Sequence, residues 1–212
     1  MDKIIFIDTL TTGMDSKRCA LYAIGGIICE DSAENTKEIK RFEMRIRPWD
    51  GARIHENSLW IGGITRGDLI HYPKEAESLE QFIKMISPHV NVKNPNDKLY
   101  LAGFNASSFD QPFIREWFER NGNNNFRNYF YVQTLDLMSL SAFALLPERK
   151  GMSDFYLQTV AKFLGVTPTT NEKYNCIDNA ETCLKMYRVL KERLKTGLHG
   201  EECRTEDIYK NF

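Results

Sequence analysis

The sequence lacks the features that mark membrane, exported and zinc-binding proteins. No apolar run in the 212 residues reaches the length of a membrane span, and the first residues show no basic segment followed by a long apolar one. The five cysteines form no C-x-x-C pair, and the four histidines form no short metal-binding spacing. A membrane span, a secretory signal, a disulfide framework and a zinc site are therefore not expected, and a cytoplasmic location is the default.

The sequence also lacks a surplus of basic charge. Its 28 Lys and Arg residues are balanced by 29 Asp and Glu residues, which leaves a formal net charge of −1. A nucleic-acid partner would therefore have to be held by local groups rather than by a general positive field. The apolar content of 42% is enough for one compact domain, which we expect over residues 1–195, with residues 196–212 as a C-terminal tail.

What the sequence does contain is a mixture of strand-like and helix-like segments. Three apolar or alternating segments close to the N-terminus predict an antiparallel meander, and two later ones predict further strands, at residues 4–8, 19–30, 39–47, 99–104 and 129–134. Helical spacing of apolar residues predicts helices at 78–86, 112–121, 135–146, 157–164 and 176–194. The expected fold class is α/β, with a mixed central sheet flanked by helices.

Three aspartates stand at the ends of these expected elements. Asp8 closes the first strand, Asp110 lies at the start of the helix that follows strand 99–104, and Asp178 lies near the start of the last helix. An α/β sheet can bring such termini to one edge, where clustered carboxylates repel each other unless a hard cation such as Mg²⁺ or Mn²⁺ neutralises them. The alternative interpretation is that each aspartate only caps an element or a turn.

Four segments in order resemble the motifs of the DEDD superfamily of 3′–5′ exonucleases. Residues 7–13, I-D-T-L-T-T-G, are similar to the first motif, a D-x-E followed by T-x-G or T-T-G. Residues 103–110 are similar to the second motif, with an apolar strand, an Asn and a later Phe-Asp. The intervening G-I-T at 63–65 and the L-x-x-x-A-x-x-L-G helix at 157–165 also match. The resemblance implies a ribonuclease H-like exonuclease fold.

The third motif of this superfamily can be aligned in two ways. Residues 174–182 read Y-N-C-I-D-N-A-E-T, and the family uses either H-x4-D or Y-x3-D. The favoured alignment pairs Tyr174 with Asp178, because it keeps both functional residues and places Thr182 four positions after the aspartate. The competing alignment pairs Tyr174 with Asn179 and loses both.

The resemblance implies a two-metal site that uses Mg²⁺ or Mn²⁺ and acts on the 3′ end of single-stranded DNA or RNA. Asp8 would bridge both cations, Asp110 would help to hold the second and Asp178 would bind the first. Tyr174 would orient the attacking water rather than deprotonate it, because an unperturbed phenol keeps its proton at neutral pH. Asp8, Asp110, Asp178 and Tyr174 are thus the expected catalytic residues.

The resemblance also implies which residues hold the terminal nucleotide. They are expected at Thr9, Thr11 and Gly13 in the first motif and at Phe104 and Asn105 in the second. The segment 60–65 is a further candidate, through aromatic stacking and phosphate contacts. The alternative for Phe104, Asn105 and the segment 60–65 is ordinary packing in the core.

Leu10 departs from the family pattern. It stands where the family has its metal-binding glutamate, so the first cation should bind more weakly. Two outcomes are open. Either the site is inactive and the fold binds nucleic acid or protein without cutting, or Glu181, three residues after Asp178 on the same helix, supplies the missing carboxylate.

The sequence is therefore consistent with three functions. The expected one is a metal-dependent 3′–5′ exonuclease weakened by Leu10. The others are a catalytically silent protein that binds single-stranded nucleic acid, and a protein-interaction module that kept only the fold. A polymerase or another protein could be a partner. The sequence leaves the choice of DNA or RNA and the oligomeric state open.

Overall fold

The fold is built on one mixed β-sheet. The structure, a computed structural model, describes residues 1–169 and 174–199, and within them five strands pair in the order β3-β2-β1-β4-β5. β2 pairs antiparallel with β1 and with β3, whereas β4 lies parallel to β1 and β5 parallel to β4. The strands are β1 (Asp2–Thr11), β2 (Leu21–Asp31), β3 (Thr36–Arg45), β4 (Leu99–Gly103) and β5 (Leu135–Asp136). The expected meander followed by parallel strands is confirmed.

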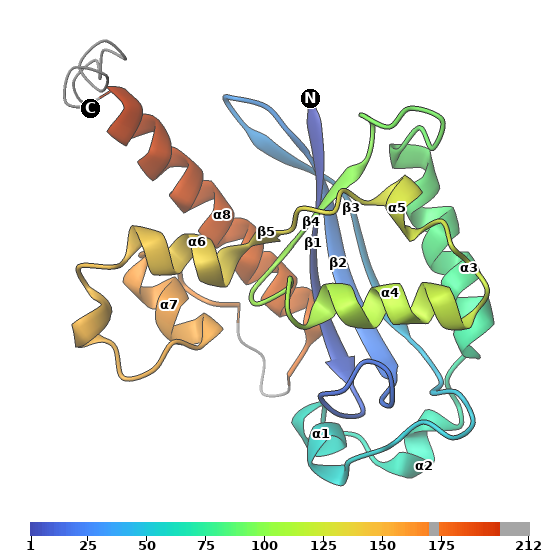
Figure 1. The fold of residues 1–212 in the computed structure, drawn as a ribbon. Coiled ribbons are helices and arrows are strands. Elements are labelled where there is room, and N and C mark those ends of the chain that lie inside the picture. Colours follow the sequence, from blue (N-terminus) through green and yellow to red (C-terminus); the bar gives the residue numbers. More distant parts are fainter. Residues whose placement is uncertain (170–173, 200–212) are drawn as a thin grey trace, which may run out of the picture.

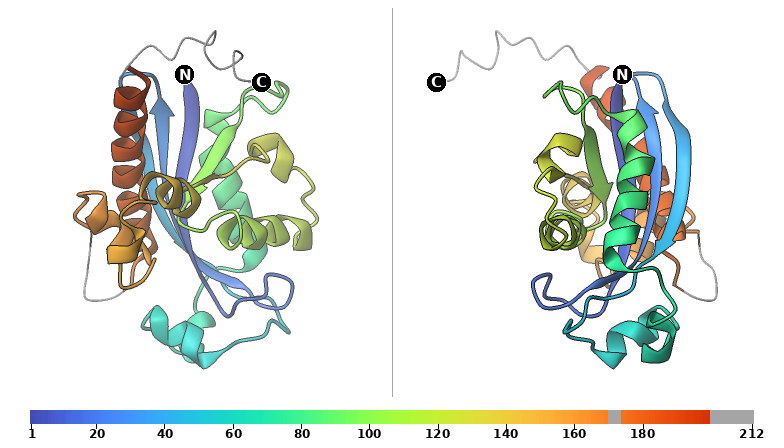
Figure 2. Two further views of the ribbon diagram at one scale, coloured as in Figure 1. Left: turned by 60° about the vertical axis from the view of Figure 1, so that its left-hand side comes forward. Right: turned by 90° about the vertical axis from the view of Figure 1, so that its right-hand side faces the viewer.

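Helices cover both faces of the sheet, as Figure 2 shows in its left view. One face carries α3 (Glu75–Ile86), η1 (Ser87–His89), α4 (Asp110–Arg120) and α5 (Phe126–Tyr129). The other carries α6 (Leu137–Ala144), η2 (Arg149–Gly151), α7 (Leu157–Phe163) and α8 (Cys176–His199). The short helices α1 (Glu56–Ile61) and α2 (Arg66–Leu69) lie beyond the end of β1 (Figure 1).

The central strand β1 is buried on both sides. Ile5 and Ile7 join the core beneath α3 and α4, whereas Ile4 and Phe6 join the core beneath α6, α7 and α8. All four side chains are at most 1% exposed. Burial of alternate residues against opposite helical layers explains why the strand reads as an uninterrupted apolar run.

The strand expected at residues 129–134 is wrong. The structure instead has the helix α5, a single bridge between Phe130 and Leu99, and then β5 at Leu135–Asp136. Two aromatic residues of that segment pack against Phe118, with ring centroids 6.2 Å away for Tyr129 and 6.4 Å for Phe130. Aromatic enrichment here reflects burial in the core, which a helical turn satisfies as well as a strand does.

The C-terminal helix is longer than expected. α8 continues to His199, so the first four residues of the expected tail, 196–199, belong to it. Residues 200–212 lie outside the described part. In that part, no helix is long and apolar enough to cross a membrane.

Candidate functional site

Asp8 lies where β1 meets the start of α8. It pairs with Gly25 of β2, and a Cβ atom on Gly25 would come within 2.5 Å of the Ile177 backbone nitrogen and 2.7 Å of the Cys176 carbonyl carbon. The missing side chain at Gly25 therefore allows the first turn of α8 to rest directly on the sheet. This close approach brings the third-motif segment against the end of β1.

Two side chains of that segment donate hydrogen bonds to Asp8. Tyr174 Oη lies 3.2 and 3.1 Å from the two carboxylate oxygens of Asp8, and Asn179 Nδ2 lies 3.4 Å from Oδ2. Burial and the neighbouring Asp8 carboxylate raise the pKa of Tyr174. Tyr174 therefore keeps its proton at neutral pH and donates it in the hydrogen bonds to Asp8.

Asp110 reaches the site from the opposite face of the sheet. It begins α4, is only 2% exposed, and its Oδ1 accepts a hydrogen bond of 2.6 Å from Thr9 Oγ1. Burial raises the pKa of Asp110 to about 7, although the Thr9 hydrogen bond acts in the other direction. Thr9 is adjacent to Asp8, so β1 fixes the second aspartate through the residue next to the first.

Asp8 and Asp110 form a pair of interacting carboxyl groups. Burial raises the pKa of Asp8 well above its ordinary value, and the negative charge of Asp110 raises it further. Two interacting carboxylates repel each other when both are charged and nothing compensates their charge. The pair therefore either holds a proton or takes up a cation.

Asp136 is a site residue that the sequence analysis missed. It caps α6 by accepting from the backbone nitrogens of Met138 and Ser139, and it also accepts from the backbone nitrogens of Asn105 and Ser107. It thereby fixes the loop between β4 and Asp110, in which Asn105 adopts a left-handed backbone with φ 65°. An aspartate directly before an apolar helix is a known capping signal and could have identified it.

The residues expected to hold a nucleotide make mainly internal contacts. Thr9 and Thr11 are 4% and 6% exposed, and Thr11 Oγ1 donates to the Gly13 carbonyl oxygen at 2.6 Å. A Cβ atom on Gly13 would lie 2.6 Å from Cys19 Sγ. Phe104 packs beside Phe155, with ring centroids 6.4 Å apart. These contacts give each residue a structural role, whereas Trp60 on α1 is 82% exposed.

At the third motif, the structure brings Asn179 rather than Asp178 to Asp8. Asp178 is half-buried one position earlier on α8, which corresponds to a rotation of about 100° around the helix. The carboxylate of Glu181 accepts a hydrogen bond of 2.7 Å from Nη1 of Arg41 on β3. It also pairs at 3.0 Å with Nζ of Lys185, one turn later on α8. Glu181 is thus already neutralised by two cations, which does not favour it as a replacement for the missing glutamate.

Leu10 occupies an apolar cluster at the same end of β1. It lies two residues after Asp8, so both side chains leave the strand on the same face. Leu10 is 5% exposed and packs with Tyr22, Leu59 and Cys176. The space in which a glutamate would face the metal is filled by contacts that join β1 to α1.

These residues do not fit a site for two cations. Within the described ranges no group of three or more His, Cys, Asp or Glu side chains is arranged to hold a metal ion. They do fit a single hard cation, because Mg²⁺ is commonly bound by one or two carboxylates together with water and substrate phosphate. Asp8 and Asp110 supply those two carboxylates.

Comparisons with known proteins identify the family and the fold. The family model RNase_T, described as exonuclease, matches residues 5–187. No curated protein matches the chain. Among solved structures, E. coli exonuclease I in complex with a dT13 oligonucleotide shares 19% identity at a TM-score of 0.70, covering 94% of this chain and 44% of that one.

Two further solved structures have the same fold. The zinc-bound E. coli exonuclease I complex with single-stranded DNA shares 18% identity at a TM-score of 0.70 over 92% of this chain and 41% of that one. Exonuclease I from Methylocaldum szegediense gives the same identity, TM-score and coverage, 18%, 0.70, 92% and 41%. The chain therefore spans less than half the length of these structures, and at this identity the likeness establishes the exonuclease type of ribonuclease H-like fold.

Proposed function

The chain belongs to the RNase_T exonuclease family, and on that premise we propose that it binds the 3′ end of single-stranded DNA and slowly removes nucleotides from it. One divalent cation, Mg²⁺ or Mn²⁺, would be held by Asp8 and Asp110. The observation that carries this proposal is the carboxyl pair of half-buried Asp8 and buried Asp110 at the end of β1, where loss of contact with water raises both pKa values.

The choice of substrate is supported by the solved relatives. E. coli exonuclease I has been solved in complex with a dT13 oligonucleotide, and this chain shares its fold over 44% of that chain. The exposed Trp60 on α1 offers a stacking surface close to the Leu10 cluster.

Each side chain around Asp8 would have a separate role in the reaction. A cation held by Asp8 and Asp110 would neutralise the carboxyl pair and polarise the scissile phosphate. Tyr174, which keeps its proton, would orient a water molecule by hydrogen bonding. Thr9 fixes the Asp110 carboxyl through its 2.6 Å hydrogen bond, and Asn179 holds the Asp8 carboxyl in a defined orientation.

Leu10 and Asn179 are the reason for a slow reaction. An isobutyl group cannot bind a cation, and the Asn179 amide, whose nitrogen faces Asp8, is a much weaker ligand than a carboxylate. The cation that would activate the attacking water has therefore lost two carboxylates. This observation also favours a second candidate function, in which the protein binds a 3′ end without hydrolysing it.

Shortening of a 5′-labelled oligo(dT) in the presence of Mn²⁺ tests the proposal. We expect slow, stepwise loss from the 3′ end that stops with EDTA and in Asp8→Asn, and a matched oligo(rU) reports the preference for DNA. Glu148→Gln is the control, because it removes an exposed carboxylate that lies outside all of the motif segments.

The outcomes separate the two functions. Binding of the oligonucleotide without any shortening, at micromolar protein and with Mn²⁺, would exclude the exonuclease and leave the 3′-end-binding protein. Absence of both binding and shortening would exclude both functions. Equal shortening by wild type and Asp8→Asn would show that the carboxyl pair is not the site.

A further inference from the structure

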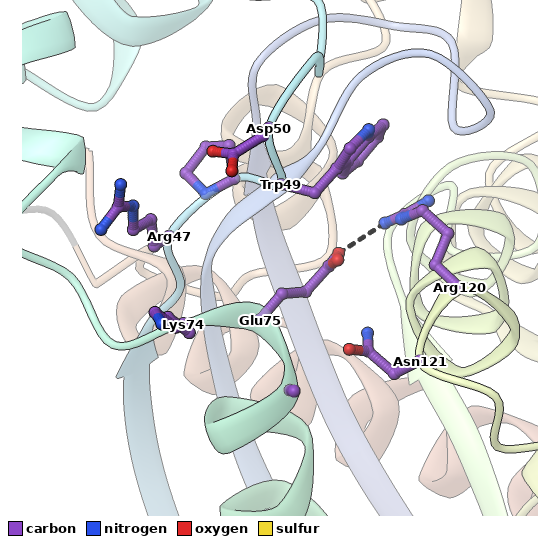
Figure 3. Close-up of a pocket in the computed structure, with 9 residues that line it drawn as sticks. Arg47, Trp49, Asp50, Lys74, Glu75, Arg120 and Asn121 are labelled. Carbon is purple, nitrogen blue, oxygen red and sulfur yellow. Dashed lines mark hydrogen bonds and ion pairs between the residues drawn. The ribbon is translucent and has the colours of Figure 1, made fainter.

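A pocket of about 410 Å³ lies at the far end of α4 from Asp110 (Figure 3). Its walls come from the turn after β3, from the start of α3 and from the end of α4. The turn contributes Arg47 and Trp49, α3 contributes Glu75 just after Lys74, and α4 contributes Arg120. No step of the proposed reaction uses any of these residues.

One wall of the pocket is tightly organised. Arg120 Nη2 pairs with Glu75 Oε1 at 2.7 Å, and the guanidinium carbon lies 3.8 Å from the centre of the Trp49 ring. Trp117 Nε1 donates to the Glu75 carbonyl oxygen at 3.0 Å. Arg120 Nε is buried and has no hydrogen-bond partner among the described residues. Trp49 is thus fixed in place by a cation that covers one of its faces.

The opposite wall carries two basic side chains, and Asp50 is the one further acidic residue that lines the pocket besides Glu75. Arg47 and Lys74 lie side by side through a backbone bridge, and Figure 3 shows both on the other side of Glu75 from Arg120. Neither forms an ion pair within the part of the chain that the structure describes, whereas Glu75 is already paired. Two unpaired cations beside a fixed indole form a local group of the kind that holds a nucleic-acid strand, in a protein with no general positive charge.

The pocket is connected to the carboxyl pair through the fold. α4 begins with Asp110 and ends with Arg120, so its two ends lie about 15 Å apart at 1.5 Å per residue. Arg120 Nη1 also donates to the carbonyl oxygen of Ser16, in the loop that follows Gly13. A DNA strand with its bases stacked as in a duplex needs about four or five nucleotides to span this distance.

We propose that this pocket binds a phosphodiester of the same DNA strand, several nucleotides away from the 3′ end held at Asp8 and Asp110. Arg47 and Lys74 bind the phosphate, and the uncovered part of Trp49 stacks against a base. The inference rests on the proposed function, and it adds that affinity depends on strand length.

Binding of oligo(dT) of 3 and of about 12 nucleotides tests the inference. Fluorescence anisotropy is measured with 5′-labelled strands in Ca²⁺, and the double variant Arg47→Ala/Lys74→Ala is compared with wild type. The control, Lys37→Ala/Lys40→Ala, removes the same charge from exposed positions on β3, where Lys40 is about 23 Å along the strand direction from Arg47.

We expect the Arg47→Ala/Lys74→Ala variant to bind the long strand about ten-fold more weakly, since charged hydrogen bonds to phosphate are lost. The slope of log affinity against log salt should fall by about 1–2 for the long strand. The 3-nucleotide strand should bind the variant and wild type equally, and the control should bind both strands as wild type does.

Three results would overturn the inference. An equal loss for both lengths would place the 3′ end itself in this pocket. Unchanged binding of the long strand, with inorganic phosphate stabilising wild type but not the variant against heat, would make the pocket a site for free phosphate. If neither strand binds wild type, both the proposed function and this inference fail. If wild type binds the short strand, the proposed function stands even when the long strand shows no dependence on Arg47 and Lys74.

Discussion

Under the proposed function, Leu10 and Asn179 stand where two metal-binding carboxylates would be, so introducing both carboxylates should create a strong cation site. The double variant Leu10→Glu/Asn179→Asp adds two carboxylates to those of Asp8 and Asp110. Position 179 faces Asp8 in the structure, and position 10 lies on the same face of β1 as Asp8. We expect this variant to be less stable than wild type without metal, because the apolar contacts of Leu10 are lost at a cost of about 1.5–3 kcal/mol.

The magnitude of the rescue by Mn²⁺ follows from binding linkage. A Mn²⁺ concentration 100-fold above the Kd of the variant adds about 2.7 kcal/mol, which for a chain of this length raises the Tm by about 5–10 °C. If each missing ligand weakens binding at least about ten-fold, the same concentration lies near or below the Kd of wild type. The gain is then at most about 0.4 kcal/mol, and the Tm rises by no more than about 1–2 °C.

Differential scanning fluorimetry with Mn²⁺ and with EDTA measures both shifts, and shortening of oligo(dT) measures the rate. Leu10→Gln/Asn179→Asp is the matched control, since glutamine has the shape of glutamate without its charge. The variant with both carboxylates should also shorten oligo(dT) faster than wild type. Equal Mn²⁺ shifts in wild type and in the double variant would refute the assignment of Leu10 and Asn179 as the lost ligands.

Other changes test the surroundings of the carboxyl pair. Burial raises the pKa of Asp110 from 3.8 to about 7, so without metal the protonated form favours the fold and stability falls as pH rises from about 4 to about 7. Asp110→Asn should flatten this dependence by at most about 4 kcal/mol, measured by urea unfolding at several pH values; an unchanged profile would contradict it. Trp60→Ala should leave the Tm within a few degrees but weaken binding of oligo(dT) by about 1–3 kcal/mol, whereas unaltered binding would remove Trp60 from the interface. Gly25→Ala should destabilise the fold by about 1–3 kcal/mol, because its Cβ would meet the start of α8 at Ile177; a neutral change would show that α8 can move away.

The sequence allowed the sheet and the first two motifs to be located. The apolar run that ends at Asp8 is a buried central strand, and Asp110 begins a helix, because periodicity and proline or glycine punctuation are strong local signals. The aromatic segment at 129–134 was misjudged, since composition alone does not distinguish a buried turn of helix from a strand.

The third motif could not be resolved from spacing. Asp178 and Asn179 differ by one position, and the close contact between Gly25 and the start of α8 decides which side chain faces Asp8. That contact joins residues about 150 positions apart, so no local pattern reports it. Asp136 is a similar case. The sequence indicates that it caps a helix, but its hydrogen bond with the Asn105 backbone nitrogen is a long-range contact that no local pattern predicts.

Leu10 also changes the kind of contact that joins α1 to the end of β1. In a site lined by glutamate, α1 and the end of β1 would meet across charged groups whose mutual repulsion only a cation relieves. Here they meet through the side chains of Leu10, Tyr22 and Leu59, which attract one another without any ion. The wall that carries Trp60 is thus held against the end of β1 by apolar contacts, which persist whether or not a metal ion is bound.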